Sequence, residues 1–569
     1  MDRMVTYMSL VNKMSFLLVV ILFAISIYFA SRKKETYELR FFESCTHEKF
    51  FHTIAFFLVL LIGIIMRVYR FPEMPNGFGQ DTVMSAVDAK ALATYGTDRF
   101  GTFMPVHLQG WTYGQQSSLL AYMMVPFVKA LGLNVLAMRL PQLIISIIGM
   151  IMIYVCIKSF LGKSAGLIAM AFTSINPWHF MQSRWAIDCN VFPHIFIIGF
   201  ALLMAFVKTK KKAALFVSMA FFGLSMYGYG VSFFFVPIFL LIACIYLLSD
   251  KLIKWIDVLW CVLIYFFVSG PEYIVMILNY FKLPTIKTPF FTMQYFPESV
   301  RSNDLLISSG NVFAQLKTNF MCLLDVTIFQ RNLDTWDVYS EFTTIYKCSL
   351  PLLFAGLVIC IRKMLKDKEK RAPYALILIY YVSSLFLGLL VNGTNIERLN
   401  VIQYANILLI IVTIDFAVKH FKASGIALGV TYLSLSVLFI NAYYKYADER
   451  IHPYMFVDFK EALECAKAQD ADRYFITPDS QFEGAKQTSE IISLFVFDVD
   501  SHYWRNMEDC TLEKGIPYDE RYMYVNLESP KDLKKGDVCV FRLKEENIFD
   551  NQSDIEIKTF GSYGVAIRK

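Results

Sequence analysis

The sequence lacks the nucleotide-binding and hydrolase motifs that are common in soluble enzymes. It contains no phosphate-cradling GxxxxGK[ST], no GxGxxG opening a helix, no GxSxG and no HExxH. Without a nucleotide-binding loop, direct use of cytoplasmic ATP or nucleotide sugars is disfavoured, so we expect an activated substrate to arrive through the lipid. The eleven cysteines form no CxxC pair and no His/Cys cluster of ligand spacing, which indicates neither a zinc site nor a disulfide framework. Only Cys465, Cys510 and Cys539, in a polar tail, could pair if that tail is exported.

Charged residues are scarce as well. They make up 18% of the 569 residues, whereas hydrophobic residues make up 56% and aromatic residues 16%. This composition predicts a polytopic membrane protein. The net charge of +6 does not indicate a nucleic-acid partner, because the basic residues stand in short clusters between apolar runs. The positive-inside rule expects that pattern. No small-residue cleavage site follows the first apolar run, which favours an uncleaved first span.

About twelve apolar runs are long enough to cross a bilayer. We expect these spans near residues 14–30, 51–69, 135–157, 164–178, 191–207, 213–227, 231–248, 256–268, 346–361, 374–391, 401–417 and 424–443. The basic clusters between them, beginning with Arg32, Lys33 and Lys34, all fall on one side if the short run 117–131 does not cross. That run contains Pro126, and we interpret it as a helix lying in the interface.

The spans and the loop charge predict a polytopic α-helical membrane protein with outer interfacial helices and a small C-terminal soluble α/β domain. Residues 1–50 form an extra N-terminal span and a cytoplasmic basic loop, and residues 51–444 form the membrane domain. Its outer loops are 70–134, 176–190 and 270–345. Residues 445–569 form the extracytoplasmic domain, in which FKEALECAKAQ has helical spacing and RYFIT, MYVNL, DVCVFRL and IEIKTF alternate like strands.

A polar outer loop broken by Gly and Pro, residues 71–116, carries the first candidate site. Asp81 stands in it where the sequence predicts the start of a helix. A carboxylate at the water edge of a hydrophobic region can serve as a general base. The alternative is a plain helix N-cap. Asp88, seven residues on, is expected to be solvated. In this loop, the residues expected to line the substrate pocket are Gln80, His107, Trp111 and Tyr113.

Two further stretches carry candidate residues. Arg184 and Asp188 are four residues apart and are expected to share a helix face, beside Trp178 and His179, which we place in the substrate pocket. A basic group beside an acidic one suits a phosphate leaving group paired with hydroxyl activation, although a simple ion pair at a span end would look the same. Arg398, in VNGTNIERLNVIQ, could bind a lipid phosphate or snorkel to headgroups.

These stretches together resemble one family. The span end IIMRVYRF, the loop PNGFGQD, the segment QQSSLLAYMMVPFVKALGLNVLAMRLPQLIISIIG and the acidic segment NPWHFMQSRWAIDCNVFP resemble the integral-membrane C-type glycosyltransferases of the protein O-mannosyltransferase and aminoarabinose transferase superfamily, in a bacterial branch similar to family 39. TNIERLNVIQY matches more loosely. The family's first acidic motif commonly reads Asp-Glu, whereas Thr82 follows Asp81 here.

The resemblance implies a reaction. A sugar on polyprenyl phosphate would be transferred with inversion to a hydroxyl of a glycan, lipid or protein at the extracytoplasmic face of the cell membrane. Asp81 would be the base, Asp188 would organise the site, and Arg184 and Arg398 would neutralise the departing phosphate. No cofactor is certain. A divalent cation, Mg or Mn, held by Asp81 and Asp188 is a minority hypothesis, because two oxygen ligands are too few to argue a metal.

Two other classes of function stay open. The first is a membrane transporter or lipid flippase, which tends to place charges within its spans, near the midplane. The predicted spans are nearly free of ionisable residues, and the polar groups gather in the outer loops. The second is a non-catalytic envelope assembly protein whose acidic residues only cap helices. The pattern favours the glycosyltransferase over both.

Overall fold

The chain forms two compact units. The computed structural model describes residues 2–32, 47–110, 115–297, 305–331, 333–480, 486–507, 511–512, 514–550 and 552–568. Unit 1 comprises Met1–Phe71, Gln142–Ile274 and Val300–Tyr446, and unit 2 comprises Pro72–Pro141, Val275–Ser299 and Ala447–Lys569. The predicted Lys33, Lys34, Trp111, Tyr113 and Cys510 lie outside the described residues.

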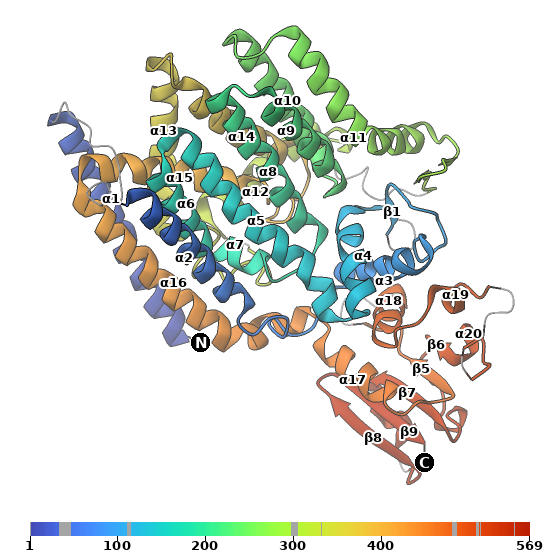
Figure 1. Cartoon of the computed structure of the whole chain (residues 1–569). Helices are drawn as coiled ribbons and strands as arrows, with labels where there is room; N and C mark the ends of the chain where they lie inside the picture. Colours follow the sequence, from blue (N-terminus) through green and yellow to red (C-terminus); the bar gives the residue numbers. More distant parts are fainter. Residues whose placement is uncertain are drawn as a thin grey trace. The chain divides into compact units, whose positions relative to one another are not determined.

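Unit 1 is built from apolar helices (Figure 1). In chain order these are α1 (Asp2–Arg32), α2 (Glu48–Val68), α5 (Val135–Leu161), α6 (Lys163–Ser174), α7 (Pro177–Gln182), α8 (Asp188–Thr209), α9 (Lys212–Leu224), α10 (Ser232–Ser249), α11 (Trp255–Phe281), α12 (Val312–Leu324), α13 (Leu350–Lys366), α14 (Arg371–Leu390), α15 (Ile402–His420) and α16 (Lys422–Ile451). The boundaries between the units fall inside α5, α11 and α16. Eleven helices among the described residues are long and apolar enough to cross a membrane, which confirms the predicted polytopic helical class.

Two of the predicted spans, 164–178 and 213–227, are not among these eleven helices. The run 164–178 is divided between α6 and α7, because the Asn176 side chain accepts from the backbone N–H of His179 at 3.0 Å and Pro177 occupies the first turn of α7. A capping residue followed by proline starts a new helix. The run 213–227 corresponds to the shorter apolar helix Lys212–Tyr227.

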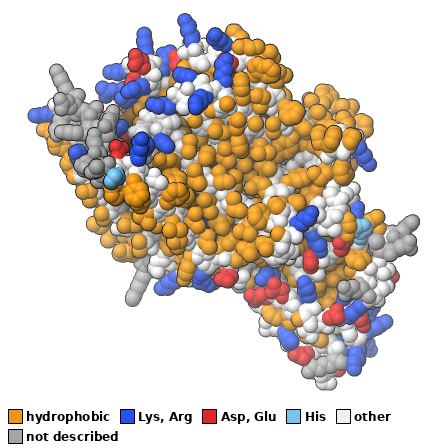
Figure 2. Space-filling view, viewed as in Figure 1, with side chains coloured by type: hydrophobic (Ala, Val, Ile, Leu, Met, Phe, Trp, Pro, Cys, Tyr) orange, Lys and Arg blue, Asp and Glu red, His pale blue; other side chains and the backbone are white. Residues whose placement is uncertain are grey.

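The basic turns of unit 1 lie together at one end of its helices. Lys212, the first residue of α9, pairs with Asp257 of α11 at 2.6 Å. Arg371, the first residue of α14, donates from Nε to Asp250, after α10, at 2.8 Å. Figure 2 shows hydrophobic side chains covering the visible face of the helices, with Lys and Arg gathered along its upper margin. This is the end that the charge pattern predicts to be cytoplasmic.

The segment expected as one loop, 270–345, contains α12 and a π-helical turn, Asp325–Phe329. Val312–Phe329 is long and apolar enough to cross a membrane by length and composition. The chain on both sides of it, however, contacts turns at the end away from the basic clusters. Asn392 donates to the carbonyl of Leu305 at 3.1 Å, and Asn176 donates to the carbonyl of Thr344 at 3.0 Å. We therefore interpret α12 as beginning and ending at one end of the bundle.

Unit 2 begins with the loop after α2. It contains α3 (Gln80–Tyr95), the two-residue strands β1 (Leu108–Gln109) and β2 (Gln115–Gln116), and α4 (Leu119–Leu131). A second small hairpin, β3 (Ile286–Lys287) with β4 (Thr292–Met293), joins this loop, because the N–H of Val106 donates to the carbonyl of Thr292 at 2.9 Å. The predicted interfacial run is α4, which has thirteen residues and contains Pro126.

The tail folds as an α/β domain on a five-stranded sheet of order β6-β5-β7-β9-β8. Its elements are α17 (Val457–Lys467), β5 (Arg473–Ile476), α18 (Lys486–Val496), α19 (Ser501–Trp504), α20 (Tyr518–Arg521), β6 (Tyr522–Met523), β7 (Asp537–Arg542), β8 (Ile555–Phe560) and β9 (Tyr563–Arg568). The predicted helix and the strands predicted at RYFIT, DVCVFRL and IEIKTF are present, whereas of MYVNL only Met523 lies in a strand, β6, and β9 was missed. Cys465 and Cys539 are free thiols.

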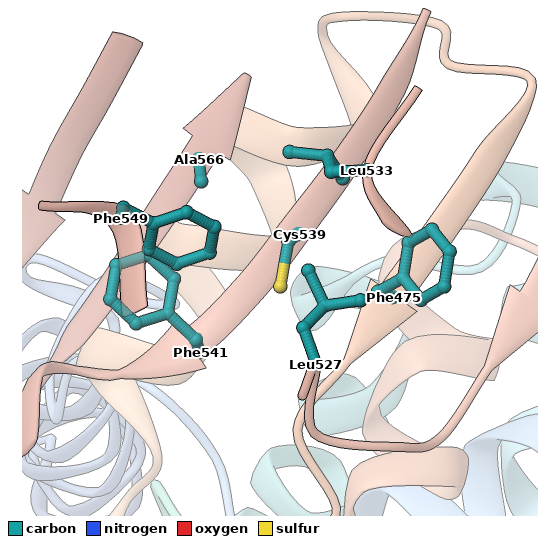
Figure 3. Close-up of a cluster of buried hydrophobic side chains, with 7 residues drawn as sticks. All are labelled: Phe475, Leu527, Leu533, Cys539, Phe541, Phe549 and Ala566. Carbon is teal, nitrogen blue, oxygen red and sulfur yellow. The ribbon is translucent and has the colours of Figure 1, made fainter. Parts of the chain in front are cut away.

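One face of this sheet carries its own hydrophobic core. Figure 3 shows seven side chains that meet there, Phe475, Leu527, Leu533, Cys539, Phe541, Phe549 and Ala566. Cys539 and Phe541 alternate with Val538 and Val540 along β7, so the strand is apolar on both faces. The register places Cys539 opposite Ala566, which continues the cluster onto β9.

Within unit 2, the tail packs against α3. The ring of Phe78, just before α3, meets the ring of Phe495 at 5.1 Å between centroids. Farther along α3, Lys90 pairs with Asp498 at 2.7 Å, and the Tyr95 hydroxyl donates to Asp500 at 2.9 Å. The tail thus supports the helix that begins with Gln80 and Asp81.

Candidate functional site

Asp81 lies in the first turn of α3, directly after Gln80. The N-cap residue is Gly79, which contributes no side-chain bond, so Asp81 is not the N-cap itself. A first-turn carboxylate faces the positive end of the helix dipole. Asp81 is half-buried, and its backbone carbonyl accepts from the side chain of Gln116 at 3.0 Å. The chain therefore positions a negative charge at the start of α3.

Arg139, which the sequence analysis did not single out, fixes the turn before α3. Its side chain is fully buried and donates to the backbone carbonyls of Pro72, Pro75 and Gly77, at 2.8 Å for Pro75 and 2.6 Å for Gly77. Gly77 has a φ of +76°, and a Cβ there would lie 2.1 Å from the carbonyl oxygen of Met455. Only glycine suits such a backbone and so close an approach.

Asp88 is buried, so the prediction that it is solvated is wrong. It is 0% exposed and forms an ion pair with Arg99, whose backbone N–H also donates to it at 2.9 Å. Arg99 in turn donates to the carbonyl of Gly110 at 2.8 Å, which ties the loop to α3. Burial raises the pKa of the Asp88 carboxyl, and the Arg99 guanidinium opposes that rise. Residue spacing along a helix could not reveal an arginine that returns from the following loop.

The other predicted loop residues are placed in part. Gln80 is half-buried in the first turn of α3. His107 is buried just before β1, with its ring 6.3 Å from that of Phe296 between centroids. Trp111 and Tyr113 lie outside the described residues.

In unit 1, Arg184 and Asp188 do not share a helix face as expected. Helix α7 ends at Gln182 and α8 begins at Asp188, so the residues between them form a turn. Asp188 is buried in the first turn of α8, where one carboxylate oxygen accepts from the backbone N–H of Cys189 at 2.8 Å. The i,i+4 spacing misled because it assumed one continuous helix.

Arg184 is fully buried and holds the end of α2. Its guanidinium donates to the carbonyl of Arg67 at 2.6 Å and to the carbonyl of Arg70 at 3.0 Å. The rings of Phe180 and Tyr443 lie 5.6 and 5.7 Å from its guanidinium carbon. Two carbonyl bonds and aromatic faces are a stable environment for a buried guanidinium.

Trp178 and His179 belong to a buried polar cluster at the same end of unit 1. His179 contacts Arg67 at 2.9 Å through one ring nitrogen and the Tyr404 hydroxyl at 3.0 Å through the other. That hydroxyl also contacts His194 at 2.7 Å. Burial, and then the charge of Arg67, lower the pKa of His179 well below its usual value. Trp178 donates from its indole to Asn400.

Arg398 lies in the loop between α14 and α15 and is half-buried. Its backbone N–H is capped by the Asn395 side chain at 2.9 Å, and its guanidinium donates to the carbonyl of Asn392. The same loop contributes Glu397, which accepts from the indole of Trp336 at 3.2 Å. The side chain of Gln182 donates to Asp337 at 3.0 Å. Sequence spacing gave no indication that these residues meet, because they stand far apart in the chain.

Among the described residues, no group of three or more His, Cys, Asp and Glu side chains could hold a metal ion. Asp81 belongs to unit 2 and Asp188 to unit 1.

Comparison with known proteins gives one sequence match and a shared fold. Residues 116–271 match the family model described as dolichyl-phosphate-mannose-protein mannosyltransferase. The matched segment includes Arg139, Arg184 and Asp188, and it excludes Asp81 and Arg398. No curated protein matches the chain.

Solved structures with a similar fold include ArnT from Cupriavidus metallidurans bound to undecaprenyl phosphate. It is 11% identical, with a TM-score of 0.54, over 92% of this chain and 98% of that chain. AglB, the oligosaccharyltransferase of Archaeoglobus fulgidus, solved with an inhibitory peptide and a dolichol-phosphate, is 10% identical over 78% of this chain and 64% of its own, with a TM-score of 0.42. The family match and the ArnT fold confirm the predicted resemblance to the membrane C-type glycosyltransferases.

Proposed function

We propose that this chain, which has the fold of the membrane C-type glycosyltransferases and their sequence pattern over residues 116–271, transfers a sugar from a polyprenyl-phosphate donor to an acceptor hydroxyl at the extracytoplasmic face. The observation that carries the proposal is the shared fold with ArnT, a protein solved with undecaprenyl phosphate bound. The matched family model is described by a lipid-phosphate sugar donor, dolichyl-phosphate-mannose, which supports the same class of donor.

In the proposed reaction, Asp81 is the base. The acceptor oxygen attacks the anomeric carbon, the bond from that carbon to the phosphate oxygen breaks, and the phosphate departs with the bonding electrons. Asp81 accepts the proton of the hydroxyl as the new glycosidic bond forms, and a single displacement inverts the anomeric centre. Its place in a first helical turn, held by Arg139 and by the tail, supports this role because a general base must be fixed in position.

Arg398 is assigned to the leaving phosphate, because it stands in a short loop at the end of the helices where the polar groups gather. Arg184 was predicted for the same task, and that task stays a prediction. Its carbonyl bonds support a positioning role at the end of α2. Asp188 lies in the next helical turn along the chain and is assigned to organising the acceptor.

The outer placement of the site is supported by the basic turns at the opposite end of unit 1, which are predicted to be cytoplasmic. Donors carried on polyprenyl phosphate in the outer leaflet would reach this end without a nucleotide. The acceptor, a glycan, lipid or protein, would enter from the aqueous side.

The test is a transfer assay with the purified chain in lipid nanodiscs. Polyprenyl-phosphate hexoses and pentoses are offered one at a time, and release of polyprenyl phosphate is measured by mass spectrometry. Asp81→Asn should retain donor binding, and its turnover should fall at least about 1,000-fold. General bases typically contribute about 100- to 10,000-fold to a rate. Glu73→Gln, an exposed carboxylate in the same loop, is the matched control and should turn over normally.

Full turnover by Asp81→Asn would remove the base assignment. If the wild-type chain neither binds nor consumes any of these donors, the glycosyltransferase proposal fails, and the transporter and assembly alternatives gain.

A further inference from the structure

Five side chains from separate parts of the chain meet at one place in unit 1. Gln182 ends α7, Trp185 lies in the turn before α8, Trp336 and Asp337 lie between α12 and α13, and Glu397 lies between α14 and α15. Two hydrogen bonds link them, from Gln182 to Asp337 at 3.0 Å and from Trp336 to Glu397 at 3.2 Å. The rings of Trp185 and Trp336 are perpendicular, with centroids 6.4 Å apart. We call these five residues the tryptophan-carboxylate cluster.

Three polar atoms of the cluster are buried without a hydrogen-bond partner among the described residues. They are Oε1 of Gln182, Nε1 of Trp185 and Oδ2 of Asp337. Their side chains are 1%, 7% and 0% exposed. A buried polar group without a partner is destabilising, so three in one place require an explanation. Gln182 offers an acceptor, Trp185 offers a donor, and Asp337 offers a donor when its carboxyl is protonated and an acceptor when it is ionised.

The charge of the cluster limits what it can bind. Burial, and next the nearby Glu397, raise the pKa of the Asp337 carboxyl well above its usual value. The Asp337 carboxyl is therefore held neutral, and the Glu397 carboxylate supplies the negative charge that disfavours a phosphate at the cluster. A hydroxyl group, in contrast, donates to a carboxyl or amide oxygen and accepts from an indole N–H. Perpendicular tryptophan rings offer apolar faces to the C–H groups of a ring-shaped ligand, and binding sites commonly combine such walls with a few placed polar groups.

We propose that the tryptophan-carboxylate cluster binds the sugar ring of the donor. The inference rests on the proposed function, because it takes the lipid phosphate to be held by Arg398. Arg398 directly follows Glu397 in the chain, so one loop presents a cation for the phosphate and a carboxylate for the neighbouring sugar hydroxyls. This order matches a donor in which a neutral ring is joined to an anionic phosphate.

The experiment compares two probes, polyprenyl phosphate alone and polyprenyl phosphate carrying a monosaccharide, for binding to the full chain in nanodiscs. The monosaccharide is the one for which wild type shows the highest affinity among hexose, pentose and aminopentose lipids. In Asp337→Asn and in Trp336→Phe, affinity for the sugar-bearing lipid should fall about 10-fold or more, whereas affinity for polyprenyl phosphate should be unchanged. Arg398→Ala should weaken both probes.

Two matched controls should change neither affinity. Trp255→Phe replaces an exposed tryptophan of α11, and Asp257→Asn replaces a carboxylate at the basic end of unit 1. Trp336→Phe keeps an aromatic ring but removes the indole N–H and the fused five-membered ring, and it carries the test if Asp337→Asn unfolds in a thermal melt. Wild type that binds neither probe would overturn the proposed function itself. Wild type that prefers the sugar-bearing lipid, with both cluster variants keeping that preference, would overturn only this inference and leave ordered water as the partner of the buried atoms.

Discussion

Replacing Arg139 should reduce transfer without touching the reacting groups. The arginine donates to three carbonyls of the turn before α3, those of Pro72, Pro75 and Gly77. In Arg139→Lys, one ammonium replaces a planar fork and reaches one or two of the three acceptors. A hydrogen bond to a charged group contributes about 1.5–3 kcal/mol, so the ordered turn should lose about 2–4 kcal/mol. Each 1.4 kcal/mol is about tenfold in population, so we expect a transfer rate about 30- to 700-fold lower.

The assay measures turnover of saturating donor lipid, together with a thermal melt to exclude global unfolding. Arg362→Lys, at an exposed position of α13, is the matched control and should behave as wild type. Arg139→Met removes all three bonds and should be slower than Arg139→Lys. Wild-type turnover in Arg139→Met, in a protein where Asp81→Asn is inactive, would refute the idea that Arg139 holds the turn for Asp81.

Two further predictions concern the tail and the buried histidine. Phe495→Ala removes a ring that packs on Phe78, so the folded tail should lose about 3–5 kcal/mol of stability. Trypsin should then release the tail faster than in the control Val525→Ala, which changes an exposed side chain. Transfer should fall as well, because α3 loses support. Because the pKa of His179 is depressed in the fold, its contribution to stability is complete above the unfolded pKa near 6.5 and is lost as the pH falls, by about 1.4 kcal/mol per unit. Melting temperatures between pH 7.5 and 5 should fall less steeply in His179→Gln; an identical pH slope would contradict this.

The membrane architecture could be predicted because it depends on local properties of the chain. Hydropathy marks the spans, and the basic clusters predict which turns lie at the same end of the helices. The ion pair between Lys212 and Asp257 joins two such turns, as expected. Likewise, alternation along β7 and β8 predicted their strands in the tail. The run 164–178 was taken as one span because hydropathy does not register that Asn176 and Pro177 start a new helix.

For the candidate site, the sequence indicated the acidic residues and the helix starts at which they stand, and their roles stay predictions. Asp81 and Asp188 each follow a clear change from apolar to polar sequence, and the structure places both in first helical turns. The residues that surround them come from distant segments. Arg139 of α5 donates to the turn before α3. The Tyr404 hydroxyl contacts His179, although the two residues are 225 positions apart in the chain. Such pairs are set by tertiary packing, which a single sequence does not reveal.

The candidate residues lie near the ends of helices α2 and α16. Tyr444, near the end of α16, donates to the carbonyl of Tyr69, just after α2, at 3.0 Å. The segment that carries Asp81 and the tail therefore both leave unit 1 at this point. Arg184 donates to the carbonyl of Arg70 at the same point. The basic turns lie at the other end of the helices. The end without them therefore contains the acidic segment of Arg184 and Asp188, and the ends of α2 and α16, from which the loop of Asp81 and the tail continue. A reaction at one face of the membrane requires that arrangement, whereas passage across it would require polar groups along the spans.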